Sequence, residues 1–183
     1  MKICMYGAAS EKINDNYKKQ AELLGEEIAR KGHSLVYGAG ATGLMGACAR
    51  GVRKGGGEII GVTPRFMHNI EDVYEHCTQL INTETMAERK TIMEDNADAF
   101  VIVPGGIGTY DEFFQVLTLK QLKRHNKPIV IFNINGYYDY IPNVIGSGIV
   151  KGFISPVVAD MFSICETYED VVNTIEKEFY QNK

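Results

Sequence analysis

The sequence of 183 residues has no tryptophan, only five prolines and four cysteines, and no apolar run of 18 residues. Without such a run, no membrane-spanning helix is expected, and the opening segment MKICMYGAAS turns polar too soon for a signal peptide. The cysteines and the four histidines are scattered and include no CxxC pair, so neither a disulfide framework nor a metal site is predicted. We therefore expect a reduced, cytoplasmic protein with no contact to a membrane.

The charge balance is slightly acidic, with a formal net charge of −4 and a pI of about 5.6. An acidic surface disfavours non-specific binding to nucleic acid. Hydrophobic residues make up 45% of the chain, which is enough for one good core at this length. We expect a single domain that spans residues 1–183.

Short β-rich runs alternate with stretches of helical periodicity along the whole chain. Strands are predicted at 2–7, 34–38, 58–63, 78–83, 99–104, 128–133 and 162–166. Helices are predicted at 14–31, 43–54, 86–97, 109–125, 137–150 and 167–181. Several strands are continuous apolar runs, which is typical of strands covered on both faces. The alternation predicts an α/β fold, a Rossmann-like open parallel sheet of about seven strands flanked by helices on both faces.

Ligands bind to such sheets at the carboxyl ends of the strands, near the point where the strand order reverses. The segments that follow the first five strands are rich in glycine and polar residues: YGAAS, GAGATG, TPRFMHN, TETMAERK and PGGIGT. The least regular stretch, 64–77, is also among them, and irregular stretches of this length usually carry function.

The segment GAGATG (38–43) fits the dinucleotide fingerprint G-x-G-x-x-G. An NAD site also needs an acidic residue near the end of the next strand to hold the ribose. Here that strand ends in Thr63 and Pro64, and its only acid, Glu58, stands at the opposite end. The simpler interpretation is that small residues let the following helix pack closely against the sheet. No P-loop motif G-x-x-x-x-G-K-[ST] occurs either.

The segment PGGIGTYDEF (104–113) places three glycines directly before Asp111 and Glu112. Glycines at a helix start leave backbone N–H groups open to an anion such as phosphate. The spacing of Thr109 and Glu112 also fits a helix capping box, T-x-x-E, which is a purely structural explanation for Glu112. A capping box does not require three glycines, however, whereas an anion cradle beside the helix does.

The segment MAERK (86–90) opens the preceding helix. Glu88, Arg89 and Lys90 are consecutive and point about 100° apart, so they cannot all face one ligand. A solvated helix face is the commonest explanation for such a run. We expect the strands at 78–83 and 99–104 to be neighbours, however, so that their following loops open at the same sheet edge and Arg89 can lie opposite Glu112.

Three segments together, PGGIGTYDE, MAERK and YGAGATGLMG, resemble the signatures of the Lonely Guy (LOG) family of cytokinin-activating phosphoribohydrolases. The resemblance extends over nearly the whole chain. It implies hydrolysis of the N-glycosidic bond of a nucleoside 5′-monophosphate to free base and ribose 5-phosphate, without a cofactor, by a homodimer. It also implies that Arg89 and Glu112 are catalytic. The implied substrate-binding residues are Glu71, Lys90, Gly105, Gly106, Ile107, Gly108, Thr109, Tyr110 and Asp111.

The sequence departs from the family pattern at three positions. Ala87 replaces a usual histidine, Asp111 replaces a common glutamate, and Ala39 replaces a glycine. The proposed catalytic groups are retained, so these changes bear on the choice of base. Relatives labelled lysine decarboxylases would need a lysine that binds pyridoxal phosphate, and no segment here presents one convincingly.

The resemblance explains why carboxylates follow a phosphate cradle. The sugar of a nucleotide lies beyond its phosphate and becomes oxocarbenium-like as the base departs, so a carboxylate there stabilises positive charge or activates water. Whether Arg89 holds the phosphate or the leaving base stays open. A non-catalytic nucleotide or cofactor carrier is the alternative, because the fold alone does not imply turnover.

The predicted helix 109–125 has a wider apolar surface than one stripe facing the sheet requires. We therefore expect a homodimer through this helix, with a helix buried on both sides within one chain as the alternative. The apolar residues are Phe113, Phe114, Val116, Leu117, Leu119 and Leu122.

Overall fold

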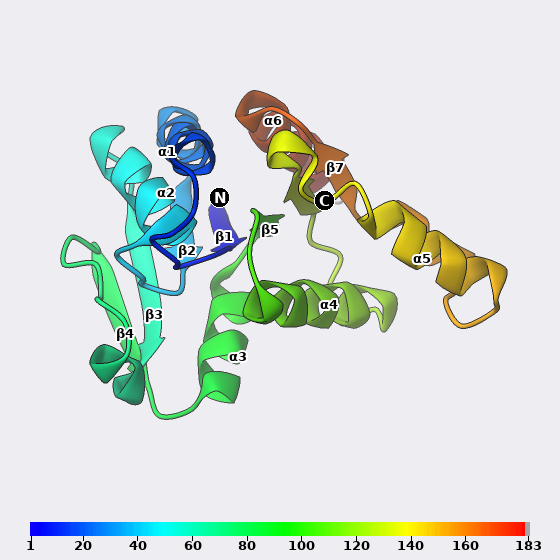
Figure 1. The fold of residues 1–183 in the computed structure, drawn as a ribbon, viewed down its shortest axis with the longest axis horizontal. Helices are drawn as coiled ribbons and strands as arrows, with labels where there is room; N and C mark the ends of the chain where they lie inside the picture. The colour runs from blue at the N-terminus through cyan, green and yellow to red at the C-terminus, as the bar shows by residue number, and fades with distance from the viewer. Residues whose placement is uncertain (182–183) are drawn as a thin grey trace.

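The computed structural model describes residues 1–181, which form an open sheet of seven parallel strands flanked by six α-helices (Figure 1). The predicted Rossmann-like α/β fold is confirmed. The strands are β1 (Lys2–Tyr6), β2 (Ser34–Tyr37), β3 (Ile59–Pro64), β4 (Gln79–Thr83), β5 (Ala99–Ile102), β6 (Ile129–Phe132) and β7 (Ser163–Cys165). The helices are α1 (Asp15–Arg30), α2 (Gly43–Lys54), α3 (Met86–Asn96), α4 (Ile107–Gln121), α5 (Ile141–Val150) and α6 (Tyr168–Gln181). None of these helices is long and apolar enough to cross a membrane.

The strand order is β4-β3-β2-β1-β5-β6-β7. The chain builds outward from β1 to the edge strand β4, then returns to place β5 on the other side of β1. In the sheet, Ile3 of β1 lies between Leu35 of β2 and Ala99 of β5. The strand order therefore reverses between β1 and β5, which is where an open α/β sheet binds its ligands.

Two cores cover the two faces of the sheet, and consecutive residues of one strand alternate between them. On β1, Ile3 and Met5 belong to the core that contains α1, α2 and α6, whereas Cys4 and Tyr6 belong to the core with α3, α4 and α5. All four side chains are almost completely buried. This is why the central strands are continuous apolar runs in the sequence.

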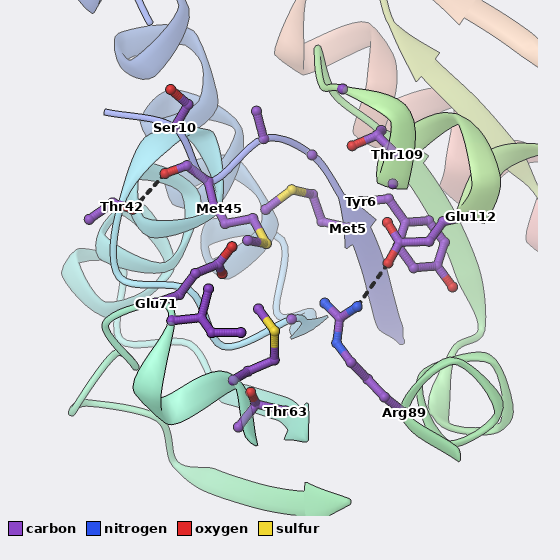
Figure 2. Close-up of a pocket in the computed structure, with 18 of the residues that line it drawn as sticks. Met5, Tyr6, Ser10, Thr42, Met45, Thr63, Glu71, Arg89, Thr109 and Glu112 are labelled. Atoms are coloured by element: carbon purple, nitrogen blue, oxygen red, sulfur yellow. Dashed lines mark hydrogen bonds and ion pairs between the residues drawn. The ribbon is translucent and has the colours of Figure 1, made fainter. Parts of the chain in front are cut away.

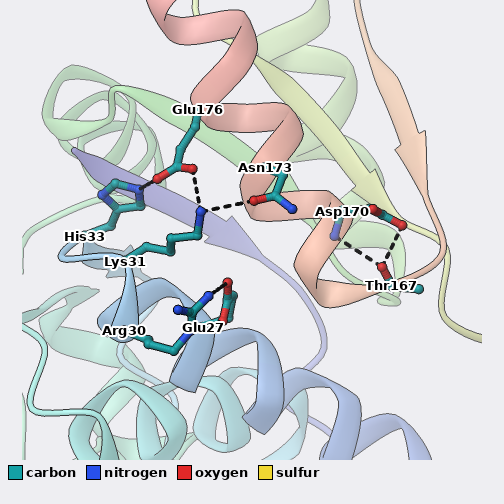
Figure 3. A network of polar contacts seen from close by, with 8 residues as sticks. All are labelled: Glu27, Arg30, Lys31, His33, Thr167, Asp170, Asn173 and Glu176. Atoms are coloured by element: carbon teal, nitrogen blue, oxygen red, sulfur yellow. Dashed lines mark hydrogen bonds and ion pairs between the residues drawn. The ribbon is translucent and has the colours of Figure 1, made fainter.

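Hydrogen bonds and ion pairs connect helix α6 to the residues that follow α1 (Figure 3). Lys31 Nζ lies 2.9 Å from a carboxylate oxygen of Glu176, and His33 Nε2 lies 3.0 Å from the other. Lys31 also donates to the side-chain oxygen of Asn173. Burial lowers the pKa of His33 below its ordinary value. The contacts join two helices on the same face of the sheet that are more than a hundred residues apart in the chain.

Most element boundaries lie within two residues of the prediction, and the end of α4 and the start of α5 differ most. Helix α4 begins at Ile107 instead of residue 109 and ends at Gln121. Helix α5 begins at Ile141 instead of residue 137, because residues 137–140 form turns. The irregular stretch 64–77 contains a 3₁₀ turn (Arg65–Asn69) and an isolated bridge from Val73 to Gly40.

Candidate active site

A cavity of about 680 Å³ opens at the carboxyl ends of the central strands, beside the β1–β5 switch point. Figure 2 shows Thr109, Glu112 and Arg89 on one side of it and Thr42, Met45 and Glu71 on the other. Its lining draws on the loops that follow β1, β2, β3 and β5 and on the start of α3. The lining residues are Met5, Tyr6, Gly7, Ala8, Ala9, Ser10, Glu11, Gly38, Thr42, Met45, Thr63, Met67, Ile70, Glu71, Asp72, Met86, Arg89, Gly106, Gly108, Thr109 and Glu112.

Arg89 and Glu112 form an ion pair in this cavity, with 3.1 Å between Nη1 and Oε1. Each side chain is only 11% exposed. The Nε of Arg89 also donates to the backbone carbonyl of Val62 at 3.1 Å. A Cβ at Gly38 would lie 1.9 Å from Nη2 of Arg89, so the guanidinium occupies space that only a glycine at position 38 leaves free. The arginine is thus held between β2, β3 and α4.

The expected proximity of Arg89 and Glu112 is therefore present, but the reasoning from neighbouring strands was wrong. Strand β4, which precedes Arg89, is the edge strand, and β3, β2 and β1 separate it from β5. The two side chains meet because α3 returns beneath the sheet and contacts all four strands from β4 to β1. The position of the crossover helix, and not the order of the strands, brings the arginine to the site.

The MAERK segment separates its charges as its helical spacing predicts. Thr85 caps α3 by accepting the N–H of Glu88, and the Glu88 carboxylate accepts the N–H of Glu84. Arg89 turns into the cavity, whereas Lys90 lies 2.9 Å from a carboxylate oxygen of Asp111. Only Arg89 of the three charged residues faces the cavity, and a capping pair holds the helix end that presents it.

The capping-box explanation of Glu112 is wrong. Helix α4 starts with Gly106 as its N-cap, and no side chain caps it. Thr109 therefore lies within the first turn and is buried, and its side chain folds over Gly105, where a Cβ would lie 2.1 Å from the threonine hydroxyl. The carboxylate of Glu112 is left to pair with Arg89.

The start of α4 presents backbone donors to the cavity. Within residues 1–181, the N–H groups of Gly106, Ile107 and Gly108 have no protein acceptor. A Cβ at Gly106 or Gly108 would meet no atom within 4 Å, so these two glycines leave open space in front of the donors. Free N–H groups at a helix N-terminus attract anions.

Helix α2, by contrast, is not open to an anion at its start. The N–H groups of Leu44 and Met45 both donate to the carbonyl of Ala8, at 2.9 and 3.2 Å. A Cβ at Gly43 would lie 2.5 Å from the same carbonyl oxygen. The small residues of GAGATG therefore serve close packing, in agreement with the simpler interpretation of that motif and against a pyrophosphate site.

The burial of Glu112 changes its acidity. Loss of solvation raises the pKa of its carboxyl group from 4.5 to about 7, although the Arg89 guanidinium opposes the increase. Near neutral pH the group is thus poised between its protonated and ionised forms. A carboxyl in this range can accept or donate a proton during catalysis.

Not all the predicted binding residues line the cavity. Glu71, Gly106, Gly108 and Thr109 do. The other five do not line it. Lys90 and Asp111 form an ion pair with each other, and Gly105 lines an adjoining cavity of about 390 Å³. Ile107 is 84% exposed, and the hydroxyl of Tyr110 donates to that of Tyr137.

The sequence-based selection missed Gly38, the Val62 carbonyl and the apolar wall formed by Met45, Met67 and Ile70. Their only signal was their position after β2 and β3.

Comparisons with known proteins identify the family. A family model described as "Possible lysine decarboxylase" matches residues 45–175. The cytokinin riboside 5′-monophosphate phosphoribohydrolase of Rhodococcoides fascians is 39% identical over 160 residues, which cover 87% of this chain and 81% of that protein. The chain belongs to the LOG family. The Arabidopsis thaliana LOG family member LOG3, which carries the same enzyme name, is 33% identical over 176 residues, 96% of this chain and 82% of that protein.

Solved structures share the fold of this LOG family chain at lower identity. The molybdenum cofactor carrier protein of Chlamydomonas reinhardtii has a TM-score of 0.75 at 21% identity, over 98% of each chain. The molybdenum cofactor binding protein of Rippkaea orientalis has a TM-score of 0.70 at 19% identity, over 96% of this chain and 94% of that one. At this level of identity the likeness establishes the architecture alone.

The description of the family model does not fit the site. A decarboxylase dependent on pyridoxal phosphate needs a lysine that forms a Schiff base in the pocket. In the part of the chain that the structure describes, no lysine lines the cavity. The lysine nearest in sequence to Arg89, Lys90, forms an ion pair with Asp111.

Proposed function

We propose that the protein hydrolyses the N-glycosidic bond of a purine nucleoside 5′-monophosphate, cytokinin-type or AMP-like, and releases the free base and ribose 5-phosphate. The observation that carries the proposal is the buried Arg89–Glu112 pair beside the free N–H groups at the start of α4. The enzyme names of the relatives, at 32–39% identity, support the same reaction.

In this proposal the 5′-phosphate lies at the N-terminus of α4. The N–H groups of Gly106 and Gly108 bind its oxygens, aided by the helix dipole. Thr109 contributes from the first turn. Lys90 and Asp111 act indirectly, because their ion pair joins α3 to α4 and so keeps Arg89 close to the phosphate end.

Glu112 serves the ribose. Ionised, it stabilises the positive charge that develops on the sugar, or it takes a proton from the attacking water. Arg89 fixes the orientation of this carboxylate and supplies a cation on the same side of the cavity. A site for binding alone gains nothing from burying an acid whose pKa is shifted towards neutrality, which favours an enzyme over a carrier.

The base lies at the opposite end of the cavity. There Met45, Met67 and Ile70 form an apolar wall, and Glu71 provides a carboxylate that accepts a hydrogen bond from an amino group. Methionine side chains adapt to ligands of different shape. We expect this end to accept adenine with or without an apolar substituent.

A homodimer is part of the proposal. On α4, Phe113, Val116 and Leu117 are buried against the sheet, whereas Phe114 and Leu122 remain 38% and 63% exposed. The helix is therefore not buried on both sides within one chain. Further exposed apolar residues lie on α5 and in the segment after it, at Val144, Val150, Phe153 and Val157. A cytoplasmic location is also proposed, since all four cysteines are free thiols.

Incubation with AMP and with isopentenyladenosine monophosphate tests the reaction. We expect free base and ribose 5-phosphate in equal amounts from at least one substrate, detected by chromatography and a reducing-sugar assay. The Glu112→Gln variant is the matched control and should lose most turnover while it still binds the nucleotide. Tight binding by the wild-type protein without release of base would favour the carrier and refute the hydrolase.

A further inference from the structure

Two consecutive tyrosines hold the turn between β5 and α4 from behind. The hydroxyl of Tyr137 donates to the carbonyl of Gly105 at 2.8 Å, and the hydroxyl of Tyr138 donates to the carbonyl of Val103 at 3.0 Å. Both belong to the segment before α5, which lies 32 to 35 residues further along the chain. Nothing in the glycine-rich motif itself indicates that its carbonyls are held in this way.

The hydrogen bond from Tyr137 has a consequence for the peptide unit between Gly105 and Gly106. In a trans peptide the C=O and N–H groups point in opposite directions, and no peptide bond in residues 1–181 is cis. Fixing the Gly105 carbonyl towards Tyr137 therefore points the Gly106 N–H away from Tyr137. Gly106 lies between the two cavities: it lines the adjoining cavity together with Gly105 and Tyr137, and it lines the cavity of the Arg89–Glu112 pair. Two adjacent glycines let a peptide rotate at little steric cost, so this orientation needs a restraint.

We propose that Tyr137 is a positioning residue of the phosphate-binding turn, whose hydroxyl holds the Gly105 carbonyl and so aims the Gly106 N–H at the substrate phosphate. The inference rests on the proposed function and adds a residue outside the family motifs. Without the hydroxyl, the carbonyl is free to turn towards the phosphate, where its partial negative charge repels the ligand.

The surroundings of Tyr137 keep it in this role. Its hydroxyl accepts a hydrogen bond from the hydroxyl of Tyr110, in the first turn of α4, at 3.4 Å. Its ring packs edge-on against Tyr17 of α1 and against Tyr138. The contact with Tyr110, together with burial, raises the pKa of Tyr137 to about 12. The hydroxyl therefore stays protonated and remains a donor.

Tyr138 provides a matched control. It makes the same kind of bond to a carbonyl two residues earlier, but the residue after Val103 is Pro104, which has no N–H to orient. The Tyr138 hydroxyl also accepts from the backbone N–H of Gly105, and this bond does not fix the Gly105 carbonyl. Tyr138 is 1% exposed, so loss of its hydroxyl leaves a buried carbonyl unpaired and lowers stability. Tyr140→Phe is a second control, because the Tyr140 hydroxyl bonds to Tyr110 and to no carbonyl of the turn.

The test is the affinity of the three Tyr→Phe variants for ribose 5-phosphate, measured by calorimetry, alongside KM and kcat for AMP. We expect Tyr137→Phe to bind ribose 5-phosphate about fivefold more weakly, the effect of losing one hydrogen bond. Its KM should rise by a similar factor with kcat nearly unchanged, because the phosphate is held equally in ground and transition states. Tyr138→Phe should melt at a lower temperature with wild-type phosphate affinity, and Tyr140→Phe should resemble the wild type.

Wild-type affinity in Tyr137→Phe overturns the inference, as does an equal loss in Tyr138→Phe, since a general loosening of the turn then explains both. Failure of wild-type protein to bind ribose 5-phosphate overturns it too. If wild-type protein binds this probe but hydrolyses no nucleotide, the proposed reaction fails, and the affinities still decide the role of Tyr137.

Discussion

Replacing Glu112 by glutamine should stabilise the protein increasingly as the pH rises. The pKa of Glu112 is higher in the folded protein, at about 7, than the ordinary 4.5 of an unfolded chain. The folded state thus binds this proton more tightly. In the wild type, this tighter proton binding adds to the free energy of unfolding; the contribution is fully present below about pH 4.5 and is lost as the pH rises through about 7. The difference between the two values corresponds to about 3 kcal/mol at pH 8 and above.

The assay is urea unfolding of wild type and Glu112→Gln between pH 5 and 8.5 at fixed protein concentration. The attraction between ionised Glu112 and Arg89 is already included in the pKa of about 7, so it adds no separate pH dependence. The informative quantity is the change in the difference between the two unfolding free energies, which should move by about 2 to 3 kcal/mol in favour of the variant. Asp111→Asn removes a carboxylate that is 60% exposed. Its difference in unfolding free energy from the wild type should change by less than about 1 kcal/mol over the same pH range. A flat profile for Glu112→Gln would show that burial does not shift this group.

Four further predictions concern activity and assembly. Gly38→Ala should push Arg89 off Glu112 and lower kcat/KM by about 10²-fold with an unchanged circular dichroism spectrum; near-normal activity would mean that the exact position of the guanidinium is unimportant. Turnover should require one phosphate, because the N–H groups at α4 need an anion while Asp111 and Glu112 repel a longer polyphosphate; equal rates on adenosine, AMP and ATP would contradict this. The rate should rise with pH through about 7 if ionised Glu112 is the active form, and a rate independent of pH from 5.5 to 8.5 would exclude that role. Light scattering should give twice the chain mass of 20.4 kDa, and activity recovered on mixing Arg89→Ala with Glu112→Ala chains would show that one site uses residues of two subunits.

The fold was predictable because the information is local. Each central strand is an apolar run, and each connecting segment has helical periodicity, so the alternation alone indicates a parallel sheet covered on both faces. The glycines before Glu112 likewise predict a helix start whose backbone N–H groups are open to anions. These features depend on residues within a few positions of each other.

What the sequence could not supply depends on contacts between distant segments. The capping pair at Thr85 and Glu88 and the apparent one at Thr109 and Glu112 have the same spacing, and only the tertiary structure decides that the first is real. Two other contacts join residues that are 32 or more positions apart. Arg89 packs against Gly38, and the Tyr137 hydroxyl donates to the carbonyl of Gly105. The meeting of Arg89 with Glu112 was anticipated, but through an assumed strand order that the sheet does not have.

The way in which Arg89 is held ties activity to the completeness of folding. Its guanidinium touches Gly38 and the carbonyl of Val62 in one half of the sheet and Glu112 in the other. Within the sheet, the two halves meet where β1 pairs with β5. A chain that had assembled β1 to β4 alone would leave this guanidinium without the carboxylate of Glu112. The Arg89–Glu112 ion pair therefore forms only when both halves of the sheet have assembled, and under the proposed function a half-folded molecule is inactive.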